Sequence, residues 1–181
     1  MQKRGQIWIS AVLYMALGVV VLTIILAAGV PLVQKMKDKN TVTQTKNMFF
    51  VLDENIRGVL NEGPGAKRYL SPFEIRAGEF YVDADNDKLT WNITTTAKLI
   101  EPGIEMSEGA VKMQNYETLL ADEYIMNLKL DYAATAKLSL VSDFQNPFAG
   151  VYSLSIKNTG TYTDDAQPPA NRPIVEITIA G

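Results

Sequence analysis

The chain has 181 residues, a net charge of −3 and a pI near 5.0, and it contains neither cysteine nor histidine. An acidic chain without a basic face is not expected to bind nucleic acid. The composition also excludes disulfides, thiolate chemistry, His-based zinc sites and a Ser-His-Asp triad. Because the commonest general base is missing, we expect a protein that is not an enzyme and uses no cofactor.

The N-terminal region is dominated by a long apolar run. No charged residue occurs from Gly5 to Gln34, and residues 7–33 are almost all apolar. As a helix, residues 7–33 would be about 40 Å long at ~1.5 Å per residue. A bilayer core is spanned by roughly 20 apolar residues, whereas the apolar part of a secretory signal has about 7–15. The run therefore predicts a membrane-spanning helix.

Charges on the two sides of the run bear on its orientation. Lys3 and Arg4 in front of the run favour an N-terminus inside the cell. The lysines between residues 35 and 39 lie behind the run and oppose this bias. The large acidic region that follows contains an N-glycosylation sequon, which is typical of extracellular segments. We expect the N-terminus inside and the rest of the chain outside.

Three interpretations of the run are open. Ala27-Ala28-Gly29 has the small residues of a signal-peptidase site, and cleavage there would remove the run on secretion. Without cleavage, the run would be a plain anchor. The third interpretation uses Lys3-Arg4-Gly5-Gln6, a short basic leader that ends in glycine directly before the hydrophobic segment. This arrangement resembles the cleavage site of archaeal prepilin-type signal peptides.

Over its N-terminal third, the chain resembles archaeal type IV pilin-like proteins, a family that includes pilins and archaellum subunits. The resemblance implies that residues 1–5 are a leader, which a membrane peptidase removes on the cytoplasmic side between Gly5 and Gln6. Ser10 stands at the fifth mature position, where many pilins carry a glutamate that archaeal subunits often lack. The apolar segment would stay on the mature protein.

By the same resemblance, the apolar helix is a membrane anchor before assembly and the core of a helical surface filament afterwards. The implied partners are identical subunits, a prepilin peptidase and an assembly ATPase with its membrane platform, and adhesion is a candidate role. The alternative is an anchored cell-surface protein that does not polymerise and whose β region binds a ligand or partner. The residues implied in the filament core are Ile7, Trp8, Val12, Leu13, Leu17, Gly18, Val21, Leu22, Ile25, Gly29 and Pro31.

Within this segment, small residues let apolar helices approach one another closely. Pro31 has no backbone N–H and is expected to weaken the helix locally. A second, more polar helical stretch follows over residues 34–62, so the predicted long helix covers residues 6–62. Its apolar stripe is densest from Met48 to Leu52, which we expect to dock on a folded body. Gly63 and the proline after it predict the end of the helix.

From Lys67 onward, apolar residues recur with period two, and clusters of glycine and proline separate the runs. Seven or eight short strands over residues 67–181 predict an extracellular β-sandwich domain. The predicted fold class is α+β, with a long N-terminal hydrophobic α-helix followed by a C-terminal antiparallel β-sandwich. The clearest runs are Phe80–Val82, Lys88–Thr95, Tyr124–Leu130, Leu138–Leu140, Tyr152–Ile156 and Val175–Ile179.

One acidic motif resembles part of a metal site. Asp83, Asp85 and Asp87 have the spacing of the first half of an EF-hand calcium loop. Lys88 then replaces the turn glycine, and Thr94 replaces the bidentate glutamate. We therefore favour a hairpin turn over a weak calcium site.

Asn92-Ile93-Thr94 is the sequon, which makes Asn92 a candidate N-glycosylation site if the body is extracellular. The motif falls on a predicted strand edge, not in an obvious loop. Because such tripeptides are common by chance, the motif alone predicts an acceptor and not its occupancy.

Overall fold

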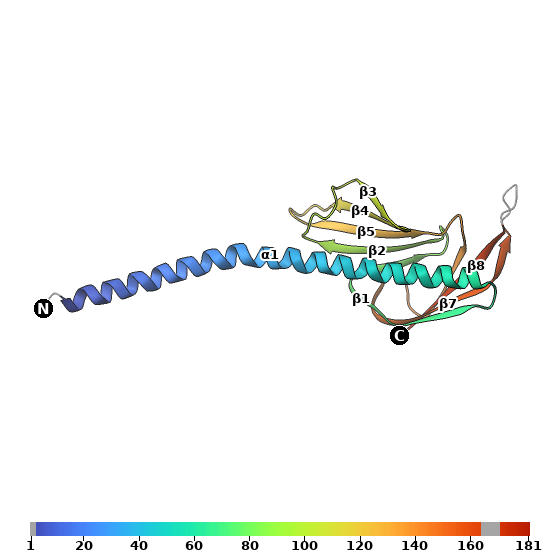
Figure 1. Cartoon of the computed structure of the whole chain (residues 1–181), viewed down its shortest axis with the longest axis horizontal. Coiled ribbons are helices and arrows are strands. Elements are labelled where there is room, and N and C mark those ends of the chain that lie inside the picture. The colour runs from blue at the N-terminus through green and yellow to red at the C-terminus, as the bar shows by residue number, and fades with distance from the viewer. Residues whose placement is uncertain (1–2, 164–170) are drawn as a thin grey trace. The chain divides into compact units, whose positions relative to one another are not determined.

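The computed structural model describes residues 3–163 and 171–181 (Figure 1). The chain forms two compact units, Met1–Lys37 and Asp38–Gly181, which are described separately below. The helix α1 (Lys3–Glu62) runs through both units. The strands are β1 (Lys67–Asp83), β2 (Lys88–Thr95), β3 (Glu105–Glu108), β4 (Val111–Glu117), β5 (Tyr124–Asp131), β6 (Lys137–Ser142), β7 (Phe148–Thr163) and β8 (Asn171–Ala180).

The predicted long helix is confirmed as one continuous element. α1 begins at Lys3, three residues before the predicted start, and Met1 and Gln2 of the predicted leader lie outside the described residues. Pro31 lies inside α1, and the helix continues through it although one backbone N–H is missing. At the C-terminal end, Gly63 has a φ of 90° and its N–H donates to the carbonyl of Val59 at 3.3 Å. This is the predicted glycine cap.

The strands form one hydrogen-bonded sheet in the order β3-β4-β5-β2-β1-β7-β8-β6. All neighbours are antiparallel except β6 and β8, which are parallel. The predicted α+β class and its mostly antiparallel β region are confirmed, whereas the separation into two sheets of a sandwich is not. β3 and β4 were not among the predicted strands.

The reason for a single sheet lies in the distribution of side chains over its two faces. On β2, the side chains of Leu89, Trp91 and Ile93 are buried, and Thr90 and Asn92 between them point to the other face. The same alternation continues on β4 and β5. A sheet with one apolar and one polar face has only one face to bury, and a helix can cover it. The docked part of α1 supplies that second layer (Figure 1).

Docking of α1 uses side chains at helical spacing. Phe49, Leu52, Ile56 and Val59 are completely buried in one core with residues of the sheet. The expectation that all of Met48–Leu52 would dock is wrong for Val51, which is 41% exposed. Five consecutive residues point to all sides of a helix, so only those three or four positions apart can face the sheet together.

Polar contacts fix the docked part of α1 at several points. The backbone N–H and the hydroxyl of Thr96 donate to the Asp38 carboxylate at 2.6 and 2.7 Å. Farther along, the buried Tyr132 hydroxyl donates to Asp53 at 2.8 Å, and Arg57 donates to the same carboxylate at 2.7 Å. Burial and the nearby Asp53 charge raise the pKa of Tyr132 far above its usual value. The phenol is therefore a permanent hydrogen-bond donor to the helix.

Candidate functional site: the apolar surface of α1

The first unit is a helix with exposed apolar side chains. The large apolar residues from Trp8 to Met36 are between 46% and 76% exposed. The segment has a mean hydropathy of 2.7 over its most apolar window, and none of that window is buried. Within the described residues, α1 is the one helix long and apolar enough to cross a membrane. By length and composition it is a candidate membrane span.

The apolar surface covers the whole circumference of this part of the helix. Val19, Val20, Val21 and Leu22 follow one another and, at about 100° per residue, point to different sides. The polar hydroxyl of Thr23 is satisfied internally, because it donates to the carbonyl of Val19 at 2.8 Å. A helix that is apolar on all sides must be surrounded by nonpolar material. It is therefore unlike the docked stretch, which has one apolar stripe.

Small residues lie along one side of this surface. Ala11, Gly18 and Gly29 are separated by 7 and 11 residues, which at about 3.6 residues per turn places them close to one line along the helix. A Cβ built at Gly18 or Gly29 would meet nothing within 4 Å apart from neighbouring residues and the backbone of its own helix. Such a line lets another helix approach closely at the backbone.

The structure places the predicted processing and filament residues in one element. Residues 3–6 form the first turn of α1, directly before the exposed apolar surface. The predicted core residues from Trp8 to Pro31 are exposed except Gly29, which is half-buried, and Ile7 belongs to the same helix. These positions point in several directions, so they make up a surface on every side and not a single groove.

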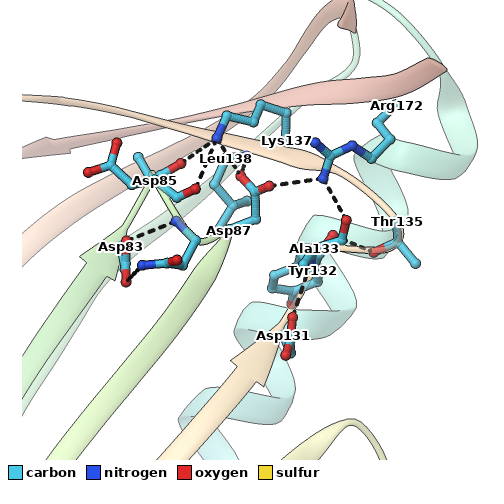
Figure 2. Close-up of polar contacts among 12 residues, drawn as sticks. Asp83, Asp85, Asp87, Asp131, Tyr132, Ala133, Thr135, Lys137, Leu138 and Arg172 are labelled. Carbon is cyan, nitrogen blue, oxygen red and sulfur yellow. Dashed lines mark hydrogen bonds and ion pairs between the residues drawn. The ribbon is translucent and has the colours of Figure 1, made fainter. Parts of the chain in front are cut away.

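The three predicted calcium ligands have separate structural roles (Figure 2). Asp83 accepts hydrogen bonds from the backbone N–H of Asn86 at 3.0 Å and from its side-chain amide at 2.8 Å, and these bonds lower the pKa of Asp83. Its strand neighbour across the turn is Lys88, so the preferred hairpin interpretation is confirmed. The Asp85 side chain is exposed, and its backbone carbonyl faces Lys137.

Asp87 is the buried centre of this cluster. Its carboxylate accepts the backbone N–H of Leu138 at 2.9 Å and pairs with Lys137 at 3.1 Å and Arg172 at 3.0 Å (Figure 2). Two cations and a backbone donor therefore take the positions that a metal ion would need. No group of three acidic side chains fit for a metal ion occurs in the part of the chain that the structure describes.

The sequon lies on the outward face of the sheet. Asn92 is half-buried on β2, and its Oδ1 accepts a hydrogen bond from the side-chain amide of Asn127 at 2.6 Å. It borders a concave surface of about 560 Å³, whose other lining residues include Tyr81, Thr90 and Asn146. The acceptor is thus on a strand, as the sequence predicts, but that strand lies inside the sheet between β5 and β1 and not at an edge. Its glycosylation stays a prediction.

No known protein family, curated protein or solved structure matches the chain. Functional inference therefore starts from the chemistry of this chain. Its most unusual feature is a helix of which one part is built into a folded body and the other is apolar on all sides.

Proposed function

We propose that the chain is a structural subunit of an archaeal type IV pilus-like surface filament, which polymerises through the apolar part of α1. The observation that carries this proposal is the exposed, all-round apolar surface from Trp8 to Met36, continuous in one helix with the docked stretch. Exposure of such a surface to water is strongly unfavourable. Both lipid and a bundle of identical helices would remove it from water.

The same surface serves both environments in this proposal. Before assembly, the apolar helix lies in the cytoplasmic membrane with its N-terminus inside. During assembly, neighbouring copies replace lipid around the helix, so the apolar area stays buried and the many contacts between helices add up. The small residues Ala11, Gly18 and Gly29 favour close packing of copies. The β body then lies outside as part of the filament surface.

Processing and assembly factors belong to the same proposal. The resemblance of Lys3-Arg4-Gly5-Gln6 to a prepilin site implies a peptidase that cuts after Gly5. An assembly ATPase with its membrane platform would extract the processed subunit, and adhesion is a candidate role. The sequence contains neither cysteine nor histidine, and this composition supports a structural role and not an enzyme.

Intact mass of the protein from its native host tests the processing step. We expect loss of Met1 to Gly5, so that the mature chain begins at Gln6, and release of subunits by shear without detergent. Substitution Gly5→Val should block cleavage and leave the protein in the membrane fraction. Ser10→Ala, a small change near the site, should be cleaved normally. Retention of residues 3–5, together with release by detergent alone, would favour the anchored protein that does not polymerise.

A further inference from the structure

The loop between β4 and β5, residues 117–124, holds a fixed conformation. The backbone N–H of Thr118 donates to the carbonyl of Glu123 at 3.2 Å, and the N–H of Leu120 donates to the Thr118 hydroxyl at 3.1 Å. Asp122 adopts a φ of 56°, a conformation that aspartate tolerates better than most residues. The 117–124 loop is therefore ordered by its own hydrogen bonds.

This ordered loop presents apolar side chains to solvent. Leu119 and Leu120 are 106% and 64% exposed, and Tyr116 and Ile125, which face each other across the hairpin, are 46% and 36% exposed. Single exposed apolar residues are ordinary, but a cluster of them within one hairpin marks an interaction surface.

The loop is also acidic. Between Glu117 and Tyr124 there are three carboxylates, Glu117, Asp122 and Glu123, and no lysine or arginine. None of the three forms an ion pair with another described residue. The surface that fits this loop is therefore basic with apolar patches. An anionic membrane surface would repel it.

The location of the loop suggests which basic surface is near. Tyr124 pairs with Thr95 across β5 and β2, and the next residue, Thr96, binds the Asp38 carboxylate. The 117–124 loop thus lies at the end of the body where α1 enters it. Residues next to Asp38 in the sequence must lie near this end as well, because consecutive Cα atoms are only about 3.8 Å apart.

Those adjacent residues carry the complementary chemistry. Lys35, Lys37 and Lys39 are exposed, Met36 among them is 65% exposed, and none of the three lysines forms an ion pair with another described residue. The basic 35–39 segment therefore offers three cations beside an apolar side chain. The acidic loop offers three anions beside two leucines.

We propose that the 117–124 loop docks on the 35–39 segment of a second copy of this chain in the filament. The inference rests on the proposed function and adds the contact between bodies of neighbouring subunits. Asp38 and Lys39 belong to the body at the end where its 117–124 loop lies. Copies placed side by side with a small axial offset would therefore bring the loop of one copy to the 35–39 segment of the next. Such a heterologous contact repeats along a helical polymer. Opposite charges fix its register and hinder wrong alignments.

Site-directed crosslinking tests this contact, since the natural chain has no cysteine. Two chains, one with Leu119→Cys and one with Lys37→Cys, are expressed together in the native host, and sheared filaments are treated with a short bismaleimide. We expect a crosslinked dimer that contains one chain of each kind. The matched control replaces Leu119→Cys by Ala134→Cys, which is also exposed but follows β5 at the opposite end of that strand. The control pair should give no dimer.

The outcomes separate the two proposals. Filaments that contain both cysteine chains without a mixed dimer would overturn the docking contact and leave the filament proposal intact. A mixed dimer that forms equally in detergent-dispersed subunits would overturn the docking contact as well, since it would reflect random collision. Absence of shear-released filaments from the unmodified chain would overturn the proposed function and this inference together.

Charge reversal provides a second measurement that does not depend on cysteine chains entering filaments. Replacing Glu117, Asp122 and Glu123 by lysine should lower shear-released filament by about tenfold, because like charges then face each other across the contact. Replacing the three lysines of the 35–39 segment by glutamate should do the same. Combining both sets should restore filament yield to within about threefold of the natural chain, if opposite charges act as a pair. Failure of the combination to exceed the single sets would overturn the proposal.

Discussion

The two parts of α1 belong to one helix but differ in the exposure of their apolar side chains to water. In residues 38–62, apolar side chains recur every three or four positions and pack on the sheet, with Phe49, Leu52, Ile56 and Val59 completely buried. From Trp8 to Met36 they occupy every side and remain exposed. Since helix formation is common to both parts, the arrangement of apolar residues around the axis decides what each part binds.

The comparison shows one element that joins a folded body to an exposed apolar segment. Each fully buried aliphatic or aromatic side chain of the docked part contributes about 1.5–3 kcal/mol relative to exposure. Among the described residues, the large side chains of the apolar part remain exposed, and in our proposal lipid or other copies bury them. Variants that act differently on the two parts therefore measure the difference directly.

The largest effect is expected from cavities in the docked part. Phe49→Ala should lower the free energy of unfolding of the body by about 3–5 kcal/mol, because the ring packs against Phe80 and Trp91. Leu22→Ala, in the exposed part, should leave that free energy unchanged. Denaturant unfolding of the detergent-solubilised full chain, followed by Trp91 fluorescence in a Trp8→Phe background, measures both. Equal effects of the two variants would contradict the division of α1 into two parts.

A somewhat smaller effect is expected at Asp87, whose ion pairs join residues of the β body without involving α1. Asp87→Asn keeps the size of the side chain but removes the carboxylate charge that pairs with Lys137 and Arg172, and should cost about 3 kcal/mol. Asp85→Asn alters an exposed carboxylate in the same turn and is the control, with no measurable change in the unfolding midpoint. A stable Asp87→Asn body would mean that the ion pairs around Asp87 contribute little.

One substitution at Asp38 tests the point where the docked part of α1 begins. Asp38→Ala removes the acceptor of two Thr96 donors and should cost about 1.5–3 kcal/mol, as expected for hydrogen bonds to a charged group. We expect faster amide hydrogen exchange over residues 38–41 and unchanged exchange beyond the buried Val42. Lys39→Ala, an exposed neighbour, should not alter the exchange. Equally faster hydrogen exchange along the whole docked part would contradict a local role of the Asp38–Thr96 hydrogen bonds.

The smallest effect concerns Tyr132, which ties the β5–β6 turn to the docked helix. Its pKa is raised in the folded body by burial and by Asp53, whereas an unfolded tyrosine ionises near pH 10. The contribution is therefore complete below pH 10, and stability falls by about 1.4 kcal/mol per pH unit above it. Unfolding measured from pH 9 to 11 should show this slope, and Tyr132→Phe should remove that part of it. An unchanged slope in the variant would contradict burial of the phenol.

Local sequence signals predict much of this fold. The helix end follows from Gly63 and Pro64, whose effects are confined to their own backbone. Strict alternation predicts β5 and β8, because a sheet with one buried face demands it. β3 escapes such prediction, since all four of its residues are exposed and no alternation marks it.

Features set by distant partners could not be predicted in this way. The parallel pairing of β6 with β8 joins residues 37 positions apart, such as Leu138 and Val175, and nothing in either strand specifies its direction. The role of Asp87 depends on Lys137 and Arg172, and these distant partners cannot be deduced from the acidic motif itself. The exposure of Leu119 and Leu120 could not be predicted either, because it depends on whether any other part of the body packs against their turn.

The unbroken course of α1 has a mechanical consequence. A pull on Asp38 along the axis of the docked helix would load the contacts between that helix and the sheet in shear. Phe49, Leu52, Ile56 and Val59 sit at successive heights on that axis, so the load is shared among them, and they must slide out of the sheet together instead of peeling away in turn. A body attached in this shear geometry resists detachment better than one hinged at a single loop.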